Sequence, residues 1–257
     1  MAVKAILYIM ERDLRYFFRY KWWLAGMVSM NLADLFIMAV VYTRMVDPKI
    51  GNYFLFFSPG ITITALFAAA FMIGREINRE IRREISHYML SLPIKRWELA
   101  FGRVLAGAVR GIIYMIPLLL TTLAVTALLA GNVPSALEIL TIILALFLIS
   151  IGTSGLSITI AVSTTSFEKY VTTRGVVYYV LFFCSTVFYP LKFIESVMPQ
   201  AFALIAKYNP LSCGADLARS FLLRNQSIEL FMPLDLMVFA LIFASAALFA
   251  YMKIMQK

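Results

Sequence analysis

The sequence predicts an all-α integral membrane protein with six transmembrane helices. Hydrophobic residues occupy 62% of its 257 positions and charged residues 14%. The mean hydropathy is +0.85. An average soluble domain is about 45–50% apolar, so the excess is too large for one buried core. We therefore expect lipid to solvate most of the chain.

Six apolar stretches are long enough to cross a bilayer, because a hydrocarbon core of about 30 Å needs about 20 apolar residues per helix. They lie near residues 23–42, 53–74, 104–130, 137–162, 171–189 and 231–252. Strands of a membrane barrel would alternate polar and apolar residues over about ten positions. The uninterrupted runs therefore predict helices, within one transmembrane domain over 1–257.

The basic residues are distributed unevenly around these stretches. The formal net charge is +9, and most lysines and arginines lie before the first span, between spans two and three, between spans four and five, and after span six. Cytoplasmic loops are enriched in Lys and Arg. We therefore expect a multi-pass protein of the plasma membrane with both termini in the cytoplasm. This location explains the charge without a nucleic-acid partner.

The first 22 residues are amphipathic. They lack the compact apolar core and cleavage site of a signal peptide, so we expect them in the mature protein. One helical face carries apolar residues: Ile6, Ile9, Met10, Leu14 and Phe17. This pattern predicts an interfacial helix over 1–22, lying along the inner leaflet. The alternative is a short cytoplasmic helix packed on the body of the protein.

The segment 75–103 is the longest predicted cytoplasmic connection. An apolar stripe recurs every four residues at Ile77, Ile81, Ile85 and Met89. The spacing predicts one helix over 75–90 with i,i+3 pairs, Glu76 with Arg79 and Glu80 with Arg83. Pro93 then breaks the helix. A protein partner should cover the stripe once it leaves the bilayer, unless the hairpin packs on its own chain.

The segment 190–212 on the opposite side is too interrupted to span a bilayer and too apolar for an open loop. Pro190, Pro199 and Pro210 divide it into pieces of roughly 8 to 11 residues, a length typical of re-entrant or interfacial helices. We predict an outer re-entrant hairpin there.

These parts, in this order, resemble the ABC-2 type transporter permease family, whose members are membrane subunits of exporters. The resemblance is carried by Glu76, Glu80, Glu84, Met89, Leu90, Leu92, Pro93, Gly102 and Arg103 in the first half, and by Asn209, Pro210, Leu211, Asp216 and Arg219 in the second. One departure is Ile85 and Ser86, where the family usually has Gly and Thr. It implies greater helical continuity there.

The resemblance implies that residues 86–93 form a coupling helix that docks on a separate ABC ATPase subunit. The residues it assigns to ATPase coupling are Glu76, Glu80, Glu84, Ile85, Met89, Leu90 and Pro93. ATP and Mg would bind to that partner subunit, with no cofactor on this chain. The family also implies a homodimer, or a pair with a similar permease.

The sequence contains no recognisable catalytic or metal site. Gly102 and Gly107 have the separation of a phosphate loop, but Ala108 and Val109 follow where Lys and Ser or Thr are needed. The single histidine, His87, has no nearby ligand set. We therefore expect that the chain is not itself an enzyme.

Two groups of residues are candidates for a translocation pathway. Asn31 and Asp34 lie one turn apart within the first span, and an intramembrane carboxylate should face protein or water. They either line a pathway or join helices by hydrogen bonds, and Arg110 either pairs with Asp34 or extends toward the cytoplasm. Thr64 and Phe67, in the second span, either line the pathway or pack in the bundle or against lipid.

The resulting hypothesis is an ATP-driven exporter of a hydrophobic or amphipathic substrate. One alternative is an ion-coupled secondary transporter that uses Asp34, although the two halves show no repeat. A further alternative is a permease of the same family that moves a polysaccharide or ions.

Overall fold

The computed structural model describes residues 2–43, 52–224 and 231–254. Every regular element in these ranges is an α-helix, which confirms the predicted class. The helices are α1 (Ala2–Phe18), α2 (Lys21–Thr43), α3 (Tyr53–Phe71), α4 (Ile73–Arg82), α5 (Ile85–Leu90), α6 (Arg96–Ala130), α7 (Ala136–Ser163), α8 (Phe167–Phe183), α9 (Leu191–Val197), α10 (Gln200–Lys207), α11 (Pro210–Leu223) and α12 (Phe231–Ile254).

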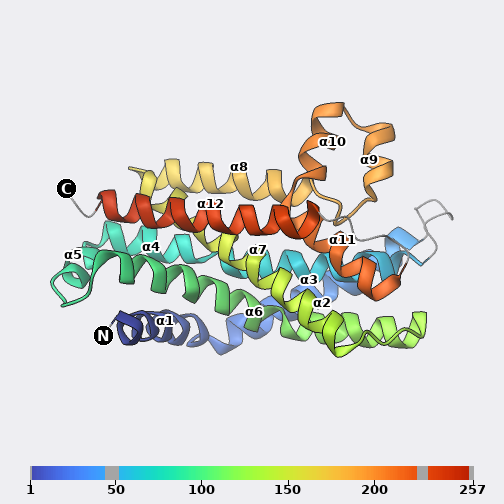
Figure 1. Cartoon of the computed structure of the whole chain (residues 1–257), viewed down its shortest axis with the longest axis horizontal. Helices are drawn as coiled ribbons and strands as arrows, with labels where there is room; N and C mark the ends of the chain where they lie inside the picture. The colour runs from blue at the N-terminus through green and yellow to red at the C-terminus, as the bar shows by residue number, and fades with distance from the viewer. Residues whose placement is uncertain (1, 44–51, 225–230, 255–257) are drawn as a thin grey trace.

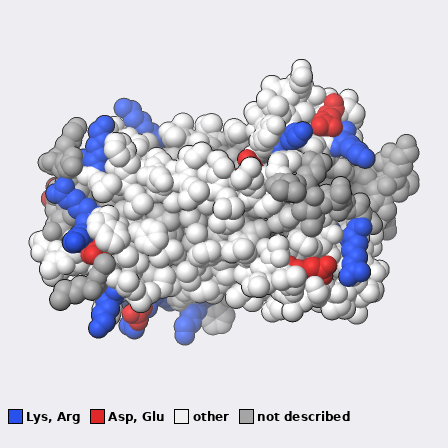
Figure 2. Space-filling model, viewed as in Figure 1, with Lys and Arg blue, Asp and Glu red and all other residues white. Residues whose placement is uncertain are grey.

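The long helices form an elongated bundle (Figure 1). Both chain ends and α5 lie at one end of it, and α9 and α10 project beside its opposite half (Figure 1). On the face shown in Figure 2, charged side chains gather mainly toward the two ends and leave a largely uncharged band between them. Such a band is what a bilayer requires, since lipid tails cannot solvate charge.

Four helical segments of the described chain are long and apolar enough to cross a membrane: Tyr53–Arg82, Arg96–Ala130, Ala136–Ser163 and Phe231–Lys253. They coincide with four of the six predicted spans. Helices α2 and α8 lie where the other two spans were predicted, α8 with only 17 residues. The chain is therefore a multi-pass membrane protein.

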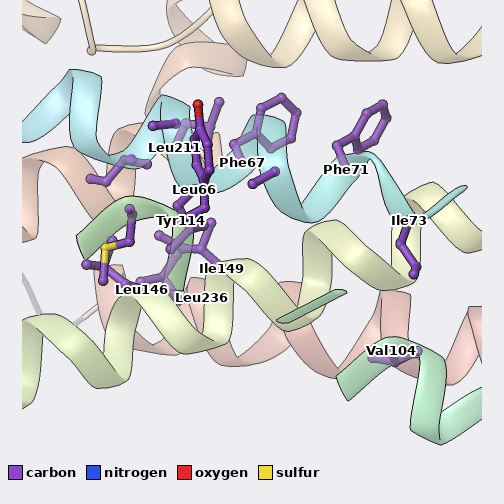
Figure 3. Packing of buried hydrophobic residues seen from close by; sticks show 14 of the residues in the cluster. Leu66, Phe67, Phe71, Ile73, Val104, Tyr114, Leu146, Ile149, Leu211 and Leu236 are labelled. Atoms are coloured by element: carbon purple, nitrogen blue, oxygen red, sulfur yellow. The ribbon is translucent and has the colours of Figure 1, made fainter. Parts of the chain in front are cut away.

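Helix α3 lies at the centre of the bundle, and most of its residues are buried. Leu66, Phe67 and Phe71 of α3 pack with residues from several other helices, as the close view in Figure 3 shows. Ser157 of α7 donates a hydrogen bond to the Phe71 carbonyl. A central helix covered on all sides accounts for the apolar run, because no face of it meets water.

Small residues allow the helices to approach one another closely. A Cβ added at Gly107 would clash with Ser154, and one at Gly111 with Ser150. One at Gly155 would overlap the backbone of Phe243 and Ala244 on α12. These glycines therefore determine how closely α6 and α12 approach α7.

The helix that follows α3 is interrupted, which corrects the prediction of one helix over 75–90. Helix α4 ends at Arg82, and Glu84 has a φ of 58°, in the left-handed region. A non-glycine residue in that region ends a helix. The chain then turns into α5, so that Met89 becomes buried instead of extending away from the body.

The apolar face of α1 packs against the body of the protein, and the position of α1 along the inner leaflet stays a prediction. Ile6, Ile9 and Phe17 are buried in the protein, and a Cβ at Gly102 of α6 would touch Ile9. The alternative, a helix packed on the body, therefore describes this face. Leu7 and Tyr8 remain exposed.

The first testable prediction concerns close packing of α7 on α12. Gly155→Ala should destabilise the protein by about 1–3 kcal/mol, because the backbone of α12 cannot move aside easily. The matched control is Gly26→Ala, where an added Cβ meets nothing within 4 Å. Thermal unfolding in detergent should give a lower Tm for Gly155→Ala only. Equal Tm values for the two variants would contradict this packing.

Candidate functional site

A cluster of charged side chains holds the hairpin of α4 and α5 to the body of the protein. Glu80 of α4 accepts hydrogen bonds from Arg12 Nη2 of α1 at 3.2 Å and from Arg103 of α6. Arg12 Nη2 also bonds to the neighbouring Asp13 at 2.6 Å. Arg103 and Asp13 are buried. We call Arg12, Asp13, Glu80 and Arg103 the charge cluster; it joins three helices.

Helix α5 reaches this cluster through Met89. Its sulfur lies 2.7 Å from Arg12 Nη1 and 3.1 Å from Arg103 Nη2, and the side chain is buried. The Arg103 guanidinium also lies over the Tyr251 ring of α12, 5.8 Å from its centroid. A displacement of α5 would therefore act directly on α1 and α6.

A second buried ion pair lies beside the cluster. Glu76 of α4 accepts a hydrogen bond from Arg110 of α6 at 2.8 Å, and the Arg110 guanidinium lies 4.7 Å from the ring centroid of Phe17. Arg110 thus pairs with neither Asp34 nor the solvent. Its Nε and Nη2 have no hydrogen-bond partner among the described residues.

The predicted i,i+3 pairs within the hairpin, Glu76–Arg79 and Glu80–Arg83, are wrong. Both glutamates turn toward the body, because only a carboxylate can compensate the buried arginines of α6. Arg79 instead donates to the Tyr16 hydroxyl at 2.8 Å.

The apolar stripe of the hairpin is covered in part by the chain itself. Ile77 is fully buried and Ile81 half-buried, whereas Ile85 is 39% exposed. The tip also exposes the basic residues Arg83, Lys95 and Arg96. Six of its other exposed residues, most of them apolar or aromatic, we call the tip surface: Glu84, Ile85, Tyr88, Leu92, Pro93 and Trp97. The side chains of Ser86, His87 and Leu90 lie outside the described residues. Among the described residues of the hairpin, the tip surface is not covered by the chain itself.

The candidate pathway residues have different environments. Asn31 donates to the Tyr114 hydroxyl at 2.7 Å and so joins α2 to α6. Thr64 is buried and bonds to the Ile61 carbonyl at 2.9 Å, and Phe67 stacks on Tyr178 of α8. Asp34 is half-buried, and the described part of the chain offers it no ion pair.

Asn209 and Pro210 fix the start of α11 at the opposite end of the bundle. Asn209 Oδ1 accepts from the Leu211 amide at 2.9 Å, as an N-cap does, and Pro210 follows at the first helical position. Asn209 Nδ2 donates to the carbonyls of Leu181 and Cys184 at 2.7 and 2.6 Å. One side chain thus ends α8 and begins α11.

Arg219 of α11 joins several segments at this end of the bundle. Asp216 and Arg219 were named as part of the family resemblance, but no contacts were predicted for them. Arg219 is fully buried and donates to the Phe56 carbonyl at 2.9 Å, the Thr186 carbonyl at 2.9 Å and the Val187 carbonyl at 3.0 Å. Asp216 pairs with it at 2.7 Å. The i,i+3 spacing of Asp216 and Arg219 was the available signal.

The second prediction tests the charge cluster. Glu80→Gln should destabilise the fold by about 3 kcal/mol, because it leaves the buried Arg103 without a counter-charge. Glu11→Gln is the matched control, since Glu11 pairs with Arg15 on an exposed face, where such pairs contribute at most about 1 kcal/mol. Thermal unfolding of both variants measures the difference. A Tm for Glu80→Gln as high as that of the control would show that the cluster is not stabilising.

A comparison with protein families matches a range of the chain that includes the residues described at both ends of the bundle. The family model described as ABC-2 type transporter matches residues 4–223, from α1 to the end of α11. A search of curated proteins finds no match. The match includes the charge cluster, the tip surface and the Arg219 contacts. The chain belongs to the ABC-2 type transporter family.

Proposed function

We propose that this chain is the permease subunit of an ATP-driven exporter and that a separate ATPase subunit docks on the tip surface. The observation that carries the proposal is an exposed apolar and aromatic tip on a hairpin anchored by buried ion pairs, in a chain of this family. The sequence has no phosphate loop, so ATP and Mg would bind to the partner.

The anchoring explains how a movement of the partner would reach the membrane. The tip continues into α5, whose Met89 contacts Arg12 and Arg103. Those arginines share Glu80, so α1, α4 and α6 respond together. Packed elements shift as units between discrete arrangements. Closure of the ATPases would therefore tilt α6 and α1 with the hairpin.

The proposed topology has six spans, with α2 and α8 as the two additional ones, and both termini in the cytoplasm of the plasma membrane. It is supported by the position of both chain ends and α5 at one end of the bundle (Figure 1). Helices α9 and α10, with the start of α11, would then form the outer re-entrant hairpin over 190–212. Two copies, or this chain and a similar permease, would enclose one pathway within the lipid bilayer.

The substrate we propose is hydrophobic or amphipathic, because the exposed faces of α2 and α8 are apolar and aromatic. Family membership alone is equally consistent with a polysaccharide or an ion. One observation favours a second function: Asp34 has no ion-pair partner among the described residues. An ion-coupled carrier would use such a carboxylate.

The third prediction tests docking on the tip. Tyr88→Ala should weaken ATPase association at least about tenfold, since aromatic anchors at interface centres contribute about 2 kcal/mol or more. Tyr8→Ala is the matched control, because Tyr8 and Tyr88 are each 70% exposed and Tyr8 lies on α1. Pull-down of the ATPase with each full-length variant measures association. Retained association in Tyr88→Ala, or equal loss in both, would reject the tip as the docking surface.

The fourth prediction separates the two functions. Asp34→Asn keeps the size of the side chain and removes its charge. Transport in proteoliposomes containing both subunits should continue with ATP and ignore proton or sodium gradients. Transport that needs an ion gradient and stops in Asp34→Asn would instead establish the carrier.

A further inference from the structure

A cavity of about 300 Å³ lies between α2, α3 and α8. Its lining includes Met27 of α2, Met72 after α3, and Arg174, Gly175 and Tyr178 of α8. Met72 also lines a second cavity of about 340 Å³. We call the two cavities together the lateral groove.

The second cavity has the composition of a membrane interface. Tyr16, Tyr20 and Trp23 line it together with Arg75 and Arg79. Aromatic rings of this type lie at the level of lipid headgroups. The one acidic residue in the lining, Glu76, is already paired with Arg110. The lateral groove is therefore basic and aromatic.

Arg174 is the exceptional residue of the groove. It has no ion pair within the described ranges, and its Nε is buried without a hydrogen-bond partner there. Its guanidinium lies over the Phe71 ring, 5.5 Å from the centroid. By contrast, Arg103, Arg110 and Arg219 are buried and each has a carboxylate partner. Arg174 is half-buried, and a guanidinium partly withdrawn from water without a carboxylate partner can bind an anion favourably.

A second unsatisfied group lies next to it. Tyr170, one helical turn before Arg174, is buried, and its hydroxyl has no partner among the described residues. Arg174 and Arg75 are charged neighbours of this hydroxyl, beside the Glu76–Arg110 pair. Tyr170 lies outside the lining of both cavities, but the positive charge of Arg174 and Arg75 acts on its hydroxyl, so this side of α8 carries an excess of positive charge.

We propose that the lateral groove binds an amphiphile with an anionic headgroup, a phosphate or carboxylate, at Arg174. Its apolar chain would lie along Met27 and Tyr178. Arg174 is seven residues into α8, about 10 Å at 1.5 Å per residue, which places it near the headgroup level of the adjacent leaflet. The ligand is either a lipid of the bilayer or a free single-chain amphiphile. That it is also the transported substrate rests on the proposed function.

Binding of two probes with the same chain, dodecyl phosphate and neutral dodecyl glucoside, tests the site. The full chain is held in nanodiscs of phosphatidylcholine without any ATPase, so a failure of ATPase docking does not affect the result. We expect the wild-type protein to prefer the phosphate at least about tenfold, as charge-assisted bonds to Arg allow. Arg174→Gln should remove that preference, and Arg174→Lys should keep part of it.

Two further variants make the result specific. Lys169→Gln removes the same charge from an exposed position of the same helix and should change binding less than about twofold. Gly175→Leu should fill the groove without strain, because a Cβ at Gly175 meets nothing within 4 Å. It should reduce binding of both probes while leaving the Tm unchanged.

Phosphatidic acid added to the nanodiscs distinguishes the two sources. If it competes with dodecyl phosphate, the groove takes a bilayer lipid; if it does not, the groove takes a single-chain amphiphile. Equal wild-type binding of both probes would overturn the proposal. This is the result expected if a carboxylate from a second copy of the chain already occupied Arg174. Equal losses in Arg174→Gln and Lys169→Gln, or unchanged binding in Gly175→Leu, would also overturn it.

Discussion

The carboxylate of Glu80 makes the interaction on which the end of the bundle that carries α5 depends. It compensates Arg103, which is buried in the bundle, and also reaches Arg12 on the first helix. An unpaired buried guanidinium would cost several kcal/mol, so α4 must stay where Glu80 can meet both arginines. The left-handed Glu84 then turns the chain back and brings Met89 to the same place. The tip surface is exposed as a consequence.

At the opposite end of the bundle a buried arginine is again compensated by a carboxylate, but both residues lie on the same helix. Arg219 is compensated by Asp216 on its own helix, and its remaining donors meet main-chain carbonyls of Phe56, Thr186 and Val187. These bonds join α11 to the start of α3 and to the turn after α8. Closely packed glycines such as Gly155 hold the helices between the two ends together. A rigid bundle with a charged anchor at each end can transmit a tilt over its length.

Sequence periodicity and hydropathy predicted the helical class and the positions of the long helices, because both depend on local composition. The direction of side chains depends on which helices become neighbours, and this was not predictable. The i,i+3 spacing of Glu76 and Arg79 favoured a pair on one helix, yet Glu76 meets Arg110, 34 positions away. Likewise Ile6 and Ile9 fit a lipid-facing stripe equally well, and only the proximity of Gly102 shows that they face α6. The proline positions of the segment 190–212 did predict where helices start, since Pro199 precedes α10 and Pro210 begins α11.

The arginines show best what the structure adds to the sequence. Arg103, Arg110, Arg174 and Arg219 all lie within or beside apolar helices, and composition gives no reason to separate them. Three have carboxylate partners, from α4 for Arg103 and Arg110 and from α11 for Arg219. In the described part of the chain, Arg174 has an aromatic ring and no carboxylate. The paired arginines have their charge compensated within the fold, although Arg103 and Arg110 keep nitrogens without a hydrogen-bond partner among the described residues. Arg174 lies beside a cavity with its charge uncompensated there, and so can bind an anion. One cation that the bundle does not neutralise, Arg174, is therefore sufficient to recognise the headgroup of an amphiphile. Such recognition does not require a polar pathway through the bundle.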